Sequence, residues 1–227
     1  MRPLRRLSCI APLALAVVAA LPASFAAAAE PQNGSQYLTL PNVQPTDTGN
    51  GGGKKIEVIE FFAYYCPHCY AFEPQLAAWV KKQGDNIVYK RVHVSGGASA
   101  LPQQRLFYTL EAMGQLEQYH QKVFDAMHVQ RLRLSSDEQV LDWAAQNGID
   151  RAKFADTYRS FGIQAKLRRA GAMMDAYGVD RWPLVVVDGR YVTSPSHVKE
   201  GATEAQQQQA TLQVMDWLVD KAKADKR

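Results

Sequence analysis

The chain has 227 residues, of which 47% are apolar and 21% are charged, and its formal net charge is +4. This composition is typical of a globular protein and excludes a collagen-like or intrinsically disordered chain. Arg2, Arg5 and Arg6 account for most of the excess charge, since the other positions hold 23 basic and 22 acidic side chains. So small a net charge gives no reason to expect nucleic acid or an anionic membrane as a partner.

The first 29 residues have the layout of a secretory signal peptide. The three arginines precede an apolar run over 7–21, and the alanines at 27–29 offer an A-x-A cleavage site. An uncleaved membrane anchor is the alternative, but Pro12 and Pro22 interrupt a run that is near the lower length for a spanning helix. We therefore expect export and removal of residues 1–29.

The cysteines indicate chemistry rather than structural cross-linking. Cys9 would leave with the signal peptide, so the mature chain keeps Cys66 and Cys69, spaced C-x-x-C. A bridge between them would close a very short loop, and the stabilisation from a disulfide grows with loop length. A bridge that stabilises so little is better explained as a reactive site.

A strand–helix–strand pattern follows the signal peptide. A short strand is expected at 37–40, and the glycine-containing segment 41–53 indicates a flexible connection. The apolar run 56–62 predicts a buried strand, and apolar residues at helical spacing predict a helix from about 67 to 84. Because 87–94 returns as a strand, these elements predict a βαβ unit with parallel strands.

The next stretch, 96–178, is helical throughout and predicts an insertion into an α/β domain made of 30–95 and 179–227. Its expected helices are 101–113, 116–128, 137–147, 151–160 and 164–177. After it, 184–193 predicts a β-hairpin with an Asp-Gly turn, and apolar residues around 212–219 indicate a last amphipathic helix.

Cys66 directly follows a predicted strand and begins a predicted helix, with Pro67 suited to the first helical position. Free N–H groups and the positive end of the helix dipole favour a thiolate there, and His68 adds a hydrogen-bond donor. Both effects lower the pKa of Cys66, which makes it a reactive thiolate and a good leaving group. Cys69 can close the disulfide or resolve a mixed disulfide, so the pair is a redox signal.

Half of a zinc site is the alternative for this pair. A closed structural zinc site needs four ligands, and a second cysteine pair is missing. His93, His120, His128 and His197 are scattered along the sequence. We therefore expect neither a metal nor an organic cofactor.

Segment 60–69, EFFAYYCPHC, resembles the strand and active site of the DsbA-type disulfide oxidases of the thioredoxin superfamily. The C-P-H-C sequence is specific to that family, since thioredoxins typically carry G-P between the cysteines. The helical block 96–178 also resembles the insertion of that family. The likeness covers nearly the whole mature chain and implies an α/β, thioredoxin-like fold with an inserted all-helical subdomain.

The resemblance also implies roles outside the cysteine pair. Glu60 would be a buried acid beneath the disulfide that moves protons, because a buried carboxylate is costly unless it is paired or shares a proton. Its basic partner on the next strand would be Arg91 or Lys90. The alternative for Glu60 is a strand-edge carboxylate that reaches solvent.

Pro183 would be the cis-proline that faces the disulfide and binds the substrate chain. An ordinary trans proline at the start of a strand is the alternative. Trp182 stands where the family usually has Val or Thr, and Arg181 where Gly is common in the closest relatives. Trp182 is therefore a candidate hydrophobic contact for substrates.

The sequence thus predicts an exported, monomeric enzyme of the periplasm that donates the Cys66–Cys69 disulfide to reduced exported proteins. By resemblance, a DsbB-type membrane protein linked to quinones would reoxidise it. A disulfide reductase or isomerase of the same superfamily is the second interpretation, and a non-enzymatic metal-binding module is the third.

Overall fold

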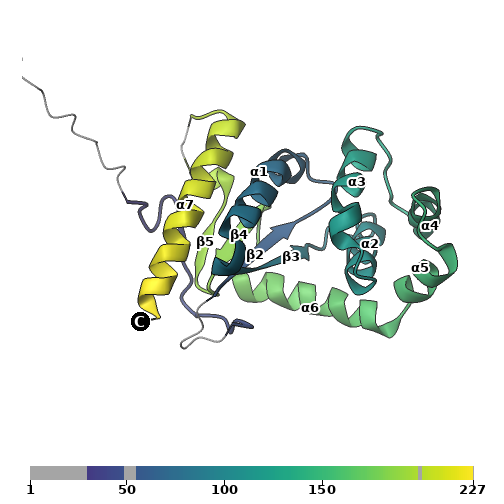
Figure 1. Ribbon diagram of the computed structural model, residues 1–227, viewed down its shortest axis with the longest axis horizontal. Coiled ribbons are helices and arrows are strands. Elements are labelled where there is room, and N and C mark those ends of the chain that lie inside the picture. Colours follow the sequence, from purple (N-terminus) through teal and green to yellow (C-terminus); the bar gives the residue numbers. More distant parts are fainter. Residues whose placement is uncertain (1–29, 49–54, 199–200, 227) are drawn as a thin grey trace, which may run out of the picture.

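A five-stranded mixed sheet lies at the centre of the computed structural model, which describes residues 30–48, 55–198 and 201–226 (Figure 1). The expected signal peptide lies outside these residues. The strands are β1 (Leu38–Thr39), β2 (Ile56–Phe62), β3 (Ile87–His93), β4 (Leu184–Val187) and β5 (Tyr191–Thr193). Their order is β1-β5-β4-β2-β3, and β2 and β3 run parallel, as a βαβ unit requires.

The central strand β2 carries the residues that lead into the cysteine pair. All seven of its residues are buried, in agreement with the apolar run from which it was predicted. Its register with β3 places Glu60 opposite Arg91. On its other side β4 is antiparallel, and Asp188 and Gly189 turn β4 into β5 with φ values of 55° and 63°. Positive φ at both positions is the geometry of the Asp-Gly hairpin turn.

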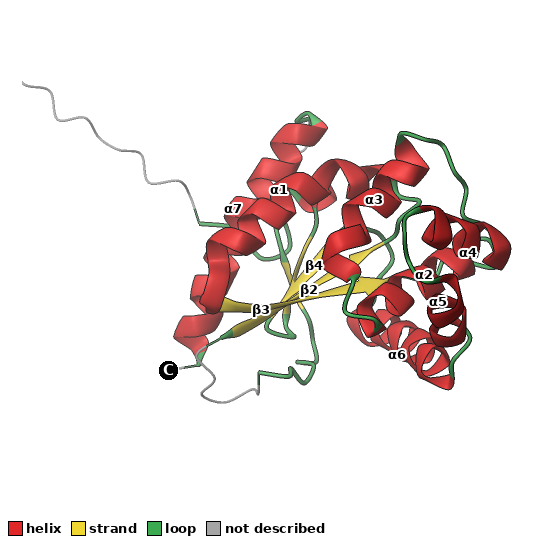
Figure 2. Ribbon diagram, turned by 45° about the vertical axis from the view of Figure 1, so that its right-hand side comes forward, coloured by secondary structure: helices red, strands yellow, loops and turns green. Residues whose placement is uncertain are grey.

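Helices cover both faces of the sheet and extend beyond it (Figure 2). They are α1 (Pro67–Gln83), α2 (Leu101–Ala112), α3 (Leu116–His128), α4 (Asp137–Gln146), α5 (Arg151–Tyr158), α6 (Phe161–Tyr177) and α7 (Glu204–Asp225), with short 3-10 helices at Gly84–Asn86 and Pro195–His197. On one face of the sheet, β2 forms a hydrophobic cluster with α1 and α7 that includes Val58 of β2 and Leu218 of α7. On the opposite face the Phe61 ring lies 5.5 Å from that of Tyr177 in α6.

The helical insertion packs beside the sheet, with α2 to α5 grouped at one end of the molecule and α6 returning along the sheet (Figure 1). α6 begins at Phe161, three residues before the predicted start, because the Ser160 side chain accepts a hydrogen bond from the Ile163 N–H and caps the helix there. Within the described part of the chain, no helix is both long enough and apolar enough to cross a membrane.

Candidate active site

The cysteine pair lies at the point where β2 turns into α1. Cys66 is the N-cap residue with extended backbone (φ −83°, ψ 116°), and its Sγ accepts a hydrogen bond from the Cys69 N–H at 3.2 Å. Pro67 occupies the first turn, where its missing N–H costs no helical hydrogen bond. Both cysteines are free thiols, and Cys69 is fully buried whereas Cys66 is 5% exposed.

The two thiols differ strongly in acidity. The hydrogen bond with the Cys69 thiol, assisted by backbone N–H groups and by His68, outweighs burial and lowers the pKa of Cys66 to about 7. Burial raises the pKa of Cys69 well above its ordinary value, and the neighbouring Cys66 and Glu60 add to that effect. Cys66 therefore carries the thiolate, and Cys69 keeps its proton.

The loop before β4 lies directly against Cys66. The Trp182–Pro183 peptide bond is cis, as the resemblance implies, and the Trp182 carbonyl oxygen lies 3.7 Å from Cys66 Sγ. The hydroxyl of Ser194, directly after β5, donates a hydrogen bond to the Pro183 carbonyl at 2.8 Å and so stabilises this loop. A pocket of about 200 Å³ opens here, lined by His68, Trp182 and Pro183 among others.

His68 makes its main contact outside the cysteine loop. Its Nδ1 lies 2.7 Å from Oε1 of Glu204, at the start of α7. This hydrogen bond raises the pKa of His68 and so favours a positive charge next to Cys66. The sequence pointed to His68 but not to Glu204, because the whole helical insertion separates these two residues in the chain.

Glu60 is buried, at 1% exposure, rather than exposed at a strand edge. Its Oε2 accepts a hydrogen bond from the Tyr89 hydroxyl at 2.6 Å and lies 3.7 Å from Nε of Arg91. Burial, reinforced by Glu73, outweighs these two partners and raises the pKa of Glu60 to about 8. A protonated Glu60 at neutral pH is therefore available as a proton donor.

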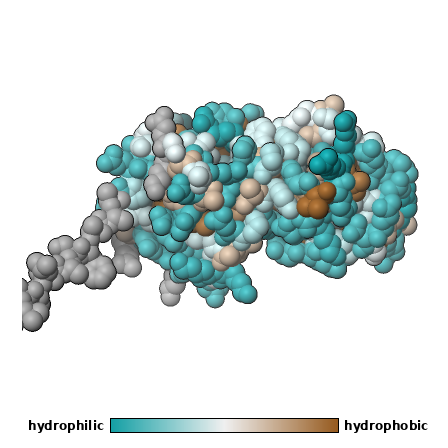
Figure 3. All heavy atoms as spheres, turned by 90° about the horizontal axis from the view of Figure 1, so that it is seen from above, coloured by the Kyte–Doolittle hydropathy of each residue, from teal (hydrophilic) through white to brown (hydrophobic). Residues whose placement is uncertain are grey.

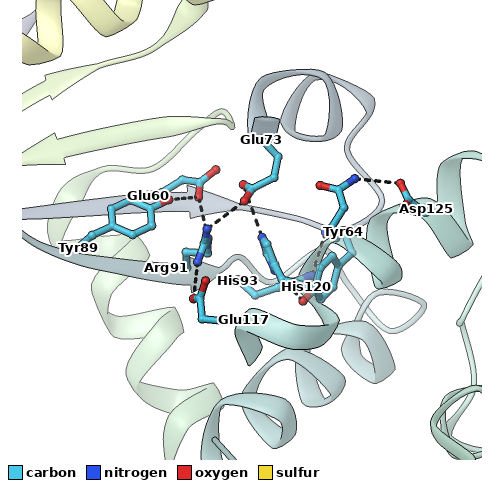
Figure 4. Close-up of polar contacts among 10 residues, drawn as sticks. Glu60, Tyr64, Glu73, Tyr89, Arg91, His93, Glu117, His120 and Asp125 are labelled. Carbon is cyan, nitrogen blue, oxygen red and sulfur yellow. Dashed lines mark hydrogen bonds and ion pairs between the residues drawn. The ribbon is translucent and has the colours of Figure 1, made fainter. Parts of the chain in front are cut away.

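The basic partner of Glu60 is Arg91 and not Lys90. Lys90 instead pairs with Glu57 at 2.6 Å and with Asp47. Arg91 also contacts Glu73 in α1 at 2.9 Å, so one guanidinium serves two buried carboxylates (Figure 4). Glu73 was missed at the sequence level, although it lies four residues after Cys69 and therefore on the same helical face.

Three of the histidines that are scattered in the sequence converge on one residue, Tyr64. The Tyr64 N–H donates to Nε2 of His93 at 3.1 Å, and the Tyr64 carbonyl accepts from Nε2 of His128 at 2.7 Å. The Tyr64 hydroxyl lies 2.9 Å from Nδ1 of His120, whose Nε2 faces Glu73 at 3.5 Å (Figure 4). Burial lowers the pKa of His93 to about 3 and that of His120 well below its ordinary value, so both stay neutral.

No group of three or more His, Cys, Asp or Glu side chains is arranged to hold a metal ion among residues 30–48, 55–198 and 201–226. The three histidines around Tyr64 instead act as hydrogen-bond partners in a buried network. Their contacts hold the residue that stands two positions before Cys66.

Comparisons with known proteins agree with this geometry. Residues 57–213 match the model of the DSBA-like thioredoxin domain. The chain is 39% identical to the thiol:disulfide interchange protein DsbA of Burkholderia cepacia over 86% of its length and 87% of that protein. It is 42% identical to DsbA of Bordetella parapertussis, over 80% of this chain and 85% of that protein.

Solved structures show the same likeness. The crystal structure of Pseudomonas aeruginosa DsbA matches with a TM-score of 0.75 and 33% identity, covering 85% of this chain and 94% of that one. Reduced DsbA1 of Neisseria meningitidis matches with a TM-score of 0.72 and 26% identity, covering 88% and 98%. The expected thioredoxin-like fold with an inserted helical subdomain is therefore confirmed, and the chain belongs to the DsbA-like thioredoxin family as a thiol:disulfide oxidoreductase.

Proposed function

We propose that this protein is exported to the periplasm and there oxidises pairs of thiols in reduced exported proteins. One observation carries the proposal: the low-pKa thiol of Cys66 lies at a helix N-terminus, 3.7 Å from the Trp182 carbonyl of the cis-proline loop. A low thiol pKa stabilises the reduced form of the pair and makes Cys66 a good leaving group, so the disulfide is readily given away.

The reaction begins with the oxidised pair. A substrate thiolate attacks Sγ of Cys66, the Cys66–Cys69 bond breaks, and Cys69 leaves with its electron pair and takes up a proton. A second substrate thiolate then attacks the substrate sulfur of the mixed disulfide and releases Cys66 as a thiolate. The substrate loses two electrons and gains one disulfide, and the enzyme becomes a dithiol.

Glu60 supplies the proton that Cys69 needs in the first step. Cys69 is a poor leaving group without one, because burial raises its pKa well above the ordinary value. The pKa of Glu60 is raised to about 8, so at neutral pH this carboxyl group is protonated and can act as a general acid. The Arg91 guanidinium is close enough to stabilise the carboxylate that remains.

His68, Trp182 and Pro183 bind the substrate chain around its reacting cysteine. The pocket of about 200 Å³ that they line adjoins the Trp182 carbonyl, which itself contacts Cys66. Trp182 provides an apolar wall where the family usually has a smaller residue. The protein acts as a monomer, and a DsbB-type membrane protein linked to quinones returns the pair to the disulfide.

The decisive experiment is an equilibrium titration of the mature protein in glutathione buffers, followed by thiol trapping. A midpoint well above that of thioredoxin, about −270 mV, is expected, since a reduced form stabilised by a low thiol pKa makes a strong oxidant. A midpoint at or below the thioredoxin value would identify a reductant instead and would overturn the oxidase assignment.

Export is tested separately by producing the full chain in a Gram-negative host and fractionating the cells. The expected product is periplasmic and begins at Glu30, directly after the alanines at 27–29. Recovery in the cytoplasm with Arg2, Arg5 and Arg6 still present would contradict the proposal.

A further inference from the structure

A second groove lies beside Tyr65 and is not lined by the cis-proline loop. Its volume is about 610 Å³, three times that of the pocket beside Trp182, and its walls include Gln103, His128, Arg131 and Arg133. It runs between the segment after β3 and the connection from α3 to α4. No step of the thiol–disulfide exchange involves this groove.

Tyr65 connects this groove to the reacting cysteine. It precedes Cys66 in the chain and lines the groove, and its ring lies edge-on to that of Trp182 with centroids 6.2 Å apart. Trp182 in turn lines the other pocket, so the two depressions meet across this pair of rings. A polypeptide whose cysteine reaches Cys66 can therefore extend into both.

The groove is positively charged. None of the residues that line it is acidic, whereas Arg131 and Arg133 are both exposed. Neither of them forms an ion pair with any residue in the described part of the chain. The arginine beside the other pocket behaves differently, since Arg181 is neutralised by Asp180 at 2.8 Å.

The α3–α4 connection holds these two arginines in a fixed place. Arg131 and Leu134 have positive φ values of 60° and 47°, which residues with side chains rarely adopt. Leu134 is buried at 2% exposure, and the carbonyl of Arg133 accepts a hydrogen bond at 3.0 Å from the amide of Gln103. Unfavourable backbone geometry that the surroundings enforce is characteristic of binding segments.

Apolar side chains accompany the arginines. Val129 is 64% exposed and Leu132 is 40% exposed, although most apolar side chains of this size are buried here. Figure 3, viewed from above relative to Figure 1, shows a hydrophobic patch among hydrophilic atoms over the end of α3. A partner for this surface would combine apolar side chains with carboxylates, which arginine binds through paired hydrogen bonds.

We propose that this groove binds an acidic, partly apolar segment of the reduced polypeptide, next to the cysteine that Cys66 attacks. The inference rests on the proposed oxidase function and adds a charge preference to it. Attraction by Arg131 and Arg133 increases the rate at which such segments meet the enzyme, and the gain diminishes as salt screens the charges.

The test uses three reduced dithiol peptides of equal length, with acidic, neutral or basic residues on one side of the first cysteine. At low ionic strength the enzyme is expected to oxidise the acidic peptide about tenfold faster than the basic one, and added salt should abolish the difference. R131Q/R133Q should remove this preference, and R131E/R133E should reverse it.

The matched control is R159Q/R168Q, which removes two exposed arginines outside the groove that also form no ion pair in the described part of the chain. It should keep the preference of the natural protein. All variants should keep their rate with a small uncharged dithiol and their redox potential, since the hydrogen bonds of the two cysteines involve none of the four arginines. Equal rates with all three peptides, or the same loss in the control, would overturn the groove proposal, whereas failure to oxidise any peptide would refute the oxidase function itself.

Discussion

Nδ1 of His68 and Oε1 of Glu204 lie 2.7 Å apart, although 136 positions separate the two residues in the chain. This contact attaches the active-site loop to the first turn of the last helix. Its hydrogen bond raises the pKa of His68, so the imidazole beside Cys66 holds a proton at a higher pH than a free histidine would.

E204Q is expected to lower the pKa of His68 towards the ordinary value. An NMR titration of the imidazole signals would measure the change, with E138Q as the control because Glu138 is also an exposed, ion-paired glutamate but lies in the helical insertion. Because the pKa of His68 is higher in the folded than in the unfolded state, protonated His68 stabilises the fold at low pH. This stabilisation is lost as the pH rises through the folded-state pKa, and E204Q should reduce it. An unchanged His68 titration in E204Q would contradict this prediction.

C69A is expected to raise the pKa of Cys66 above its value of about 7. The hydrogen bond with the Cys69 thiol is the largest of the influences that lower this pKa, and alanine removes it while the N–H at position 69 remains. The measurement is the ultraviolet absorbance of the thiolate as a function of pH. A Cys66 pKa equal to that of the reduced natural protein would show that the backbone N–H groups and His68 set the acidity without the Cys69 thiol.

E60Q is expected to stabilise the protein above pH 4.5 and to flatten the dependence of its stability on pH. Burial raises the pKa of Glu60 from 4.5 to about 8, so the folded state holds a proton that the unfolded state has lost, and stability declines as pH rises between these values. Near neutral pH the gain should be on the order of 3 kcal/mol, from about 1.4 kcal/mol for each pH unit above the unfolded-state pKa of 4.5.

Urea unfolding at several pH values would measure this effect. The same variant should oxidise peptides more slowly, because an amide cannot donate the proton that Cys69 needs. If E60Q had the activity of the natural protein but an altered stability, Glu60 would have no role in the reaction, although its burial would still affect the stability of the fold.

Y64F is expected to cost about 1 to 3 kcal/mol of folding free energy, because Nδ1 of His120 would be left buried without its hydrogen-bond partner. Y65F serves as the control, since the Tyr65 ring is partly exposed and lines a groove. Thermal or chemical unfolding of both variants checks the difference. Equal stability of the two variants would contradict this prediction, because the hydrogen bond between the Tyr64 hydroxyl and His120 would then contribute nothing measurable.

W182T should weaken the binding of peptide substrates several-fold while leaving the rate with a small dithiol unchanged. Threonine removes the apolar wall of the pocket, but the carbonyl that lies 3.7 Å from Cys66 belongs to the backbone and remains. Comparing KM and kcat for a peptide and for the small dithiol separates the two effects. W182F, which keeps an aromatic wall, should recover most of the lost affinity.

The cysteine pair, its helix and the Asp-Gly hairpin were predictable because their signals are local. A proline after an N-cap cysteine, an apolar β-branched run and an Asp-Gly dipeptide each determine the backbone within a few residues. The choice between Arg91 and Lys90 was not local, because it depends on the register of two strands. Glu60 faces Arg91 in that register, and Lys90 points to Glu57 on the other face.

The histidines around Tyr64 could not be assigned from the sequence for a related reason. His93, His120 and His128 lie 29, 56 and 64 positions from Tyr64, and two of them belong to α3 in the insertion. Nothing in their spacing distinguishes buried hydrogen-bond partners from surface residues. The signal is the packing of α3 against the active-site loop, which exists only in the folded chain.

That packing limits how far the protein can be reduced in size. A minimal version that joins the end of β3 to the residues just before the cis Trp182–Pro183 bond would keep the sheet, the cysteine pair and the cis-proline loop. It would lose His120 and His128, and with them the partners of the Tyr64 hydroxyl and carbonyl. The insertion is therefore part of the support of the reactive loop, and a transplanted C-P-H-C sequence would need equivalent partners for Tyr64 in its new host.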